Sequence, residues 1–180
     1  VSDVEFRRTM EIIDNFYNKE QLDNINNIIK NSTFNKTHQP VEAIDKREDA
    51  YPCYETEILK PNNYIFKNFV NCFNQHKNVA VKKLKTYIRK TYLSELKECK
   101  VYKQGLKSHR DRNCDAAGIV YLNTNNINDG TVIYEGDNPS VIIGSKINRC
   151  IAYKSNVWHS PNLKQTSEVR IIQPFFLYYD

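Results

Sequence analysis

Residues 109–160 read HRDRNCDAAGIVYLNTNNINDGTVIYEGDNPSVIIGSKINRCIAYKSNVWHS, and this segment carries the clearest indication of the fold. Short runs of β-branched and aromatic residues recur in it at intervals of about ten residues, separated by Asn, Gly, Asp and Pro. Such runs are typical of a sandwich, a barrel or a jelly roll. Including one run on each side of the segment, the expected strands are Cys99–Tyr102, Gly118–Leu122, Thr131–Tyr134, Val141–Ile143, Cys150–Tyr153 and Val169–Phe176.

The first half of the chain has a different pattern, in which helical spacing is more frequent. Apolar residues spaced three and four apart predict helices, whereas a polar segment with two prolines predicts a long loop. We therefore expect an α+β fold whose N-terminal helices pack against one sheet. The expected elements are a strand in Met10–Phe16, helices over Asn18–Asn31, Pro61–His76 and Val79–Leu93, and a loop over Thr37–Tyr54.

Length and composition fit one globular domain over residues 1–180, with a mixed helical part at 1–98 and a β-rich core at 99–180. An aromatic content of 12% argues against disorder. No apolar run reaches the roughly 20 residues of a membrane helix, and the start lacks a signal-peptide core. Five Cys without a C-x-x-C pair indicate reduced thiols, so we expect a cytoplasmic protein.

Histidine is rare, which makes its positions informative: the chain has 4 His. His109 is followed by Arg110 and Asp111, and in an extended segment positions i and i+2 share one face. His159 comes several expected strands later, enough for an antiparallel sheet to return to its start. Two His and one carboxylate on one face leave open positions on a metal, as in non-haem Fe(II) oxygenases.

Arg170 lies between apolar residues of the last expected strand, Val169–Phe176. Charged side chains are rarely buried without a partner. A planar guanidinium is suited to a carboxylate, which it binds through two parallel hydrogen bonds. A buried acidic cosubstrate would therefore explain an arginine at this position.

The order His-x-Asp, strands, His and then Arg resembles the Fe(II)/2-oxoglutarate-dependent oxygenases, particularly their prolyl-4-hydroxylase-like branch. The resemblance implies a double-stranded β-helix, or jelly roll. It implies that His109, Asp111 and His159 ligate Fe(II), and that Arg170 binds the far carboxylate of 2-oxoglutarate. The implied activity is hydroxylation of a peptidyl or amino-acid-like substrate by O₂, with decarboxylation of 2-oxoglutarate to succinate.

Shorter matches extend the resemblance. Tyr102, followed by Lys-Gln-Gly, resembles the family's Tyr-x-x-Gly, and Tyr121 and Asn123 lie in a segment that resembles its "YLN" strand. These three residues are therefore candidate cosubstrate contacts. Asp129 departs from the family pattern, because it replaces the first Gly of a Gly-Gly-Thr turn. Residues 35–98 match no part of the family, so the substrate stays open.

Each candidate residue also has a simpler interpretation. His109 could be an exposed loop residue, and His159 a packed side chain. Asp115 competes with Asp111 as the carboxylate ligand. Arg170 could pair with Glu168 or another surface acid. Cys114, close to the triad, fits a small buried residue better than a ligand.

Three other functions remain open at this point. One is a non-catalytic jelly-roll module, and another is a cupin-type metal enzyme that does not use 2-oxoglutarate. The third is nucleic-acid binding by the basic run Lys77–Lys103, which is more typical of a solvated helix face. The lead interpretation predicts 2-oxoglutarate and a peptide, protein or small molecule as partners, with no membrane and no nucleic acid.

Overall fold

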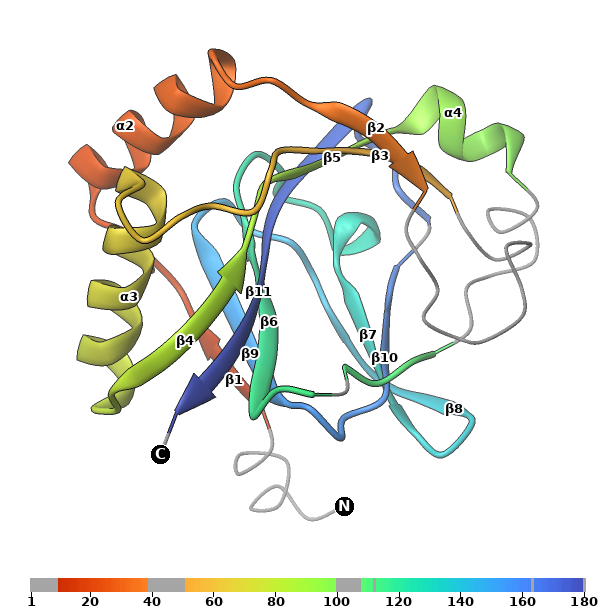
Figure 1. The fold of residues 1–180 in the computed structure, drawn as a ribbon. Helices are drawn as coiled ribbons and strands as arrows, with labels where there is room; N and C mark the ends of the chain where they lie inside the picture. The colour runs from red at the N-terminus through yellow and green to blue at the C-terminus, as the bar shows by residue number, and fades with distance from the viewer. Residues whose placement is uncertain (1–9, 39–50, 100–107, 112, 163, 180) are drawn as a thin grey trace.

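The computed structural model describes residues 10–38, 51–99, 108–111, 113–162 and 164–179 (Figure 1). Within these residues, eight strands form one antiparallel sheet in the order β1-β9-β6-β11-β5-β3-β2, and β4 pairs with the C-terminal half of β11. Their bounds are β1 (Met10–Ile13), β2 (Asn35–His38), β3 (Pro52–Glu55), β4 (Val81–Thr86), β5 (Arg89–Tyr92), β6 (Ala116–Tyr121), β9 (Arg149–Lys154) and β11 (Val169–Tyr179).

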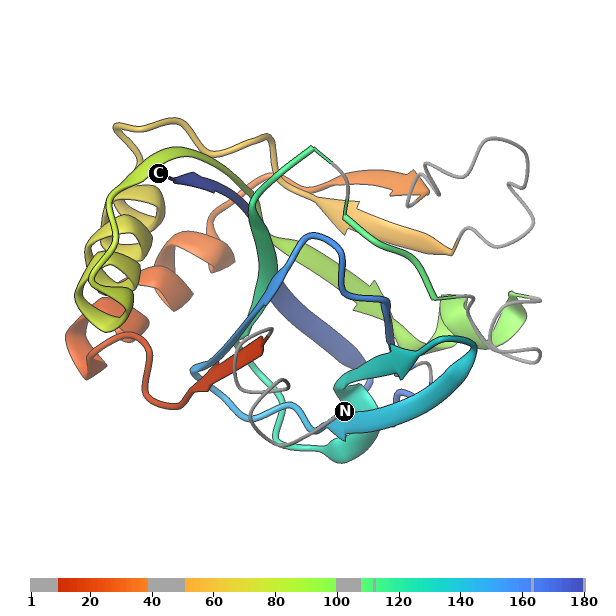
Figure 2. The same cartoon turned by 90° about the horizontal axis from the view of Figure 1, so that it is seen from below.

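A smaller sheet in the order β10-β7-β8 faces the large one (Figure 2), and side chains from both sheets line the pocket described below. Ile133 and Ile143 of the small sheet share one apolar cluster with Ile119, Tyr121 and Ile151 of the large sheet. Two facing antiparallel sheets with an apolar layer between them are the architecture of a jelly roll. The small sheet consists of β7 (Thr131–Glu135), β8 (Asn138–Ile143) and β10 (His159–Pro161).

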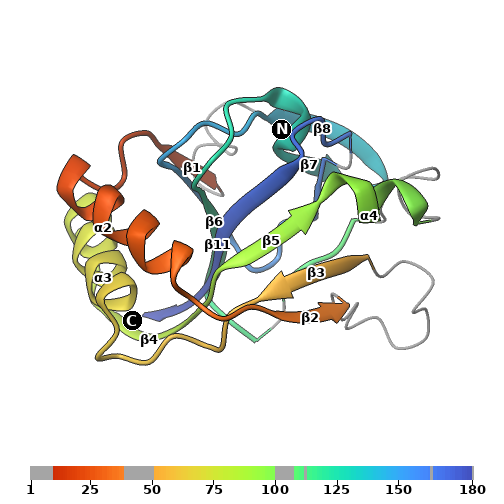
Figure 3. The same ribbon diagram turned by 90° about the horizontal axis from the view of Figure 1, so that it is seen from above.

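Helices α2 (Lys19–Lys30) and α3 (Tyr64–Lys77) cover the outer face of the large sheet (Figure 3). Asn18 caps α2, and its side chain forms a capping box with Gln21. Asn63 caps α3, which begins three residues after the turn at Pro61. The helices bury an apolar stripe against the strands, because Ile25 and Phe69 join Phe175 in the main core. The expected arrangement of helices on one sheet is confirmed.

The expected helix over Val79–Leu93 is wrong. This segment forms β4 and β5, followed by the short helix α4 (Leu93–Glu98). Its apolar residues fit helical spacing, but its burial alternates as in a strand, since Leu84 is buried between exposed Lys83 and Lys85. Pairing with β11 decides the outcome, because a strand here satisfies the backbone of the sheet's longest strand.

The expected loop over Thr37–Tyr54 is also corrected at both ends. Its first residues belong to β2 and its last to β3, and these strands pair with each other. The large sheet therefore takes strands from both sides of residue 99. The strands expected after residue 115 are present, whereas the one expected at Cys99–Tyr102 falls largely outside the described residues.

The five cysteines are free, and three of them are buried. Among the described residues, none of the helices is long and apolar enough to cross a membrane.

Candidate metal centre

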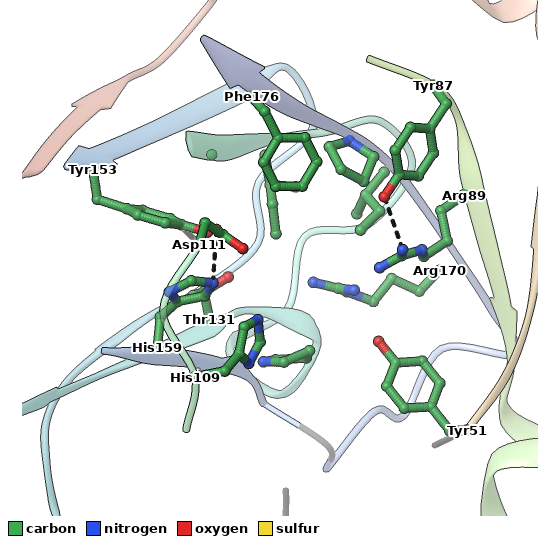
Figure 4. A pocket seen from close by; sticks show the side chains of 15 residues that line it. Tyr51, Tyr87, Arg89, His109, Asp111, Thr131, Tyr153, His159, Arg170 and Phe176 are labelled. Carbon is green, nitrogen blue, oxygen red and sulfur yellow. Dashed lines mark hydrogen bonds and ion pairs between the residues drawn. The ribbon is translucent and has the colours of Figure 1, made fainter. Parts of the chain in front are cut away.

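His109, Asp111 and His159 converge at one end of the space between the sheets (Figure 4). His109 and His159 face each other in an antiparallel bridge, in which each backbone N–H donates to the other's carbonyl oxygen at 2.9 Å. Asp111 lies two residues beyond the bridge, and its Oδ2 is 3.2 Å from Nε2 of His159. One ligand atom from each of the three side chains lies within 4.8 Å of the others.

His159 is held in the orientation that a metal ligand needs. Its Nδ1 is 3.0 Å from the carbonyl oxygen of Val157, which can only accept, so Nδ1 carries the proton and donates. When the ring is neutral, its lone pair is on Nε2, the nitrogen on the side of Asp111; when the ring is protonated, Nε2 donates to the Asp111 carboxylate instead. Metal-binding histidines usually donate their other ring N–H to a carbonyl or carboxylate in this way. The ring is 5% exposed and packs on Tyr153, with 4.4 Å between ring centroids.

Asp111 is held in its ionised form. Burial by itself raises the pKa of this carboxyl, but the hydrogen bond from His159 and the charges of His159, His109 and Arg89 outweigh it, so the pKa is lowered. An ionised carboxylate beside two imidazoles is a donor set suited to a divalent transition metal. The competing carboxylate, Asp115, accepts a hydrogen bond from the backbone of Tyr179 instead.

Cys114 is close to the triad, and its side chain is half-buried. Its Sγ lies 3.6 Å from the carbonyl oxygen of Asp111. Burial, followed by the charges of Asp111 and Asp115, raises the thiol pKa to about 11. Among the described residues, the ligand atoms that converge are those of His109, Asp111 and His159, and Cys114 does not belong to this group.

Arg170 extends from β11 into the same pocket and is 4% exposed. Its Nε donates to the carbonyl oxygen of Asp129 at 2.7 Å, whereas its Nη2 is buried and has no hydrogen-bond partner among the described residues. Arg170 therefore binds the backbone of Asp129, whereas Glu168, the alternative partner, has an exposed side chain. A buried guanidinium nitrogen without a partner is costly unless a ligand completes it.

Asp129, the departure from the family's glycine pair, organises the surroundings of Arg170. Its buried carboxylate accepts from the backbone of Thr166 at 3.2 Å and from the hydroxyl of Ser167. These bonds fix the segment before β11 while the Asp129 carbonyl receives Arg170. The aspartate therefore has a structural role that a glycine could not fill.

The predicted cosubstrate contacts have different positions. Tyr121 is fully buried behind Arg170, with 5.7 Å between its ring centroid and the Arg170 Cζ, and its hydroxyl is 2.6 Å from Oγ1 of Thr131. Asn123 does not line the described pocket, because its amide ties β6 to β11 by bonding the backbone of Val169 and Ile171. Tyr102 lies outside the described residues.

Three further pocket residues were not found from the sequence. Arg89 is 7% exposed, and its guanidinium is bound by Glu55 at 2.6 Å and by the Tyr87 hydroxyl at 2.9 Å. Tyr51 lies on the same side, and Figure 4 shows Arg89 and Arg170 directed toward the space opposite the triad. The sequence does contain a pattern that could have identified them: polar and charged side chains at alternate positions, Lys83, Lys85, Tyr87 and Arg89, as on one face of a strand. Because a helix was expected here, this pattern was not used.

Sequence comparison gives no match, either to a family model or to a curated protein. Comparison of structures gives many, and three represent them. A prolyl hydroxylase from Trichoplax adhaerens, solved with a peptide of the hypoxia-inducible factor oxygen degradation domain, matches with a TM-score of 0.65 and 14% identity. The match covers 94% of this chain and 83% of that one.

The other two are bacterial. A prolyl-4-hydroxylase from Pseudomonas putida has a TM-score of 0.60 and 11% identity, over 96% of this chain and 93% of that one. HygX from Streptomyces hygroscopicus, with nickel, 2-oxoglutarate and hygromycin B bound, has a TM-score of 0.61 and 10% identity. That match covers 96% of this chain and 84% of HygX. The chain therefore has the fold of the prolyl hydroxylases and other 2-oxoglutarate-Fe(II) oxygenases.

Proposed function

We propose that residues 1–180 form one oxygenase domain that uses Fe(II), O₂ and 2-oxoglutarate to hydroxylate a peptidyl or amino-acid-like substrate. The observation that carries the proposal is the buried, unpartnered Nη2 of Arg170 in the same pocket as His109, Asp111 and His159. A metal-binding triad alone fits many chemistries. A triad with a cation aimed into the same enclosed space fits a metal chelator that also carries a distal carboxylate.

Each residue has a defined task in this proposal. His109, Asp111 and His159 would hold the metal on one side and leave its other positions open. The Nδ1 bond of His159 to Val157 keeps the imidazole in the ligating tautomer. Arg170 would orient the cosubstrate by its far carboxylate, with its own position fixed by the Asp129 carbonyl and the Tyr121 ring.

The pocket wall is suited to oxidative chemistry. Bound Fe(II) and 2-oxoglutarate would supply O₂ activation, with release of succinate and CO₂. Tyr153, Phe176 and Ile119 line the pocket near the triad and exclude water from it. Arg89 brings a second guanidinium, but Glu55 compensates its charge; Arg170 has no carboxylate partner among the described residues, and its fully buried Nη2 lacks a hydrogen-bond partner there.

The test is anaerobic absorption spectroscopy of the protein with Fe(II) and 2-oxoglutarate. Chelation of the metal by the cosubstrate gives a metal-to-ligand charge-transfer band. We expect the band in the parent protein, its loss in His109→Ala, and a requirement for far more 2-oxoglutarate in Arg170→Ala. Absence of the band at saturating Fe(II) and 2-oxoglutarate would exclude the oxygenase function and favour the non-catalytic jelly-roll module.

A further inference from the structure

The pocket side chains Tyr87 and Arg89 belong to a row of alternate residues that continues to the exposed lysines Lys83 and Lys85. In the extended run that comprises β4, residues 87–88 and β5, Leu84 and Ile88 belong to the helix-side core. Tyr87 and Arg89, at the alternate positions, line the pocket. Strand alternation therefore places Lys83 and Lys85 on the pocket face as well.

The neighbouring strand confirms this direction and adds aromatic rings. Lys85 pairs with Phe176 of β11, which lines the pocket, and Lys83 pairs with Tyr178. The Lys85 Nζ is 5.6 Å from the Phe176 ring centroid, and the Lys83 Nζ is 5.1 Å from the Tyr178 ring centroid. We call Lys83, Lys85, Phe176 and Tyr178 the basic ledge.

The two lysines carry uncompensated charge. Both are exposed, and among the described residues neither forms an ion pair with a carboxylate. Arg89, deeper along the same row, is neutralised by Glu55. The net positive field of the row is therefore concentrated on the basic ledge, beside the pocket.

The geometry of the basic ledge favours an extended acidic peptide. Positions i and i+2 of a strand are separated by roughly 6–7 Å, which equals the spacing of alternate side chains in an extended peptide. Nucleic-acid binding surfaces of this kind offer open aromatic faces to the bases. Here the lysine ammonium groups already lie over the Phe176 and Tyr178 rings, while their N–H donors remain available to carboxylates.

We propose that the basic ledge docks acidic residues of a peptide substrate, at alternate positions flanking the residue that enters the pocket. This inference rests on the proposed function and specifies its substrate class. Docking can be tested separately from catalysis through Lys83 and Lys85, because neither lysine lines the pocket and neither is a metal-binding candidate.

The experiment measures peptide binding by fluorescence anisotropy, without metal or 2-oxoglutarate. The probe is a labelled peptide of alternating Glu and Thr residues, and the control probe has Gln in place of Glu. We expect the parent protein to bind only the Glu peptide, with affinity that falls as salt is added. Lys83→Gln/Lys85→Gln should weaken binding about tenfold. Lys60→Gln/Lys67→Gln, with the same charge change at two exposed sites elsewhere, should bind as the parent does.

Charge reversal provides a test that loss of folding cannot imitate. Lys83→Glu/Lys85→Glu should lose the Glu peptide and bind an oligo-lysine probe instead. The inference would be overturned if both Gln double variants bound the Glu peptide equally weakly, or if the parent did not bind it at all. It would also be overturned if the parent bound an oligothymidylate more tightly than the Glu peptide and lost that binding in Lys83→Gln/Lys85→Gln. The charge-transfer band with Fe(II) should persist in Lys83→Gln/Lys85→Gln, so failure of docking and failure of the oxygenase proposal give different results.

Discussion

Replacing Arg170 by Gln should separate cosubstrate binding from folding. A Gln amide at this position can still donate to the Asp129 carbonyl, as the arginine Nε does, but it removes the unpartnered end of the guanidinium. Hydrogen bonds to charged groups are worth about 1.5–3 kcal/mol each. Loss of a paired contact to the 2-oxoglutarate carboxylate should therefore weaken its binding by roughly 3 kcal/mol, or about 100-fold.

Thermal unfolding in the presence of Mn(II) measures both effects. At 2-oxoglutarate equal to about 100 times its Kd, the parent should gain about 2.7 kcal/mol, which corresponds to a rise in Tm of roughly 5–10 °C. At the same concentration Arg170→Gln should gain about 0.4 kcal/mol, a rise of roughly 1 °C. Without 2-oxoglutarate its Tm should stay close to the parent's, because the bond to the Asp129 carbonyl is kept, and the lost contact with the Tyr121 ring is offset by removal of a buried guanidinium nitrogen that has no partner among the described residues.

Arg149→Gln is the matched control. It also removes a guanidinium, but one that pairs with Asp14 near the surface. Its 2-oxoglutarate-dependent rise in Tm should equal that of the parent. The reasoning would be refuted by an undiminished rise in Arg170→Gln, or by an equal loss in both variants.

Three other predictions follow from single contacts. Gly118→Ala would place a Cβ 2.0 Å from the Ile151 carbonyl oxygen, so the free energy of unfolding should fall by roughly 3 kcal/mol in a denaturant titration; a change within error would contradict the packing of β6. Partial burial and the nearby carboxylates raise the pKa of the Cys114 thiol to about 11, so alkylation at pH 8 should be roughly 100-fold slower than for a thiol of pKa 9.0. The rate, followed by mass spectrometry, should increase tenfold per pH unit up to about pH 10, and fast labelling at pH 8 would show that the pKa is not raised. Asp129→Ala leaves the Ser167 hydroxyl without its acceptor, so the free energy of unfolding measured by calorimetry should fall by about 1–3 kcal/mol and 2-oxoglutarate should bind several-fold more weakly. An unchanged Tm would show that the carboxylate does not organise the segment before β11.

Local sequence patterns predicted the candidate site better than the first half of the fold. His109 and Asp111 share a face because two-residue alternation is a strictly local property. His159 joins them through the backbone bridge to His109, a long-range contact that the order of strands suggested. Arg170 stood out because a charge between apolar strand residues needs a partner.

Tertiary pairing explains what the sequence did not predict. The segment from Val79 to Leu93 has apolar residues that suit either periodicity, and only β11 beside it selects the strand. Arg89 and Tyr87 enter the pocket because of that pairing, so they could not be found while a helix was expected. Asn123 matched a family motif, but its amide is used between strands, which depends on contacts about 46 residues away.

The central claim is that the triad binds a metal while Arg170 binds 2-oxoglutarate. The most direct test is the structure of a crystal grown anaerobically with Mn(II) and 2-oxoglutarate. We predict that anomalous scattering places Mn(II) between His109, Asp111 and His159. The far carboxylate of 2-oxoglutarate should accept a hydrogen bond from Nη2 of Arg170. A metal bound elsewhere, or 2-oxoglutarate bound away from Arg170, would contradict the proposed oxygenase site.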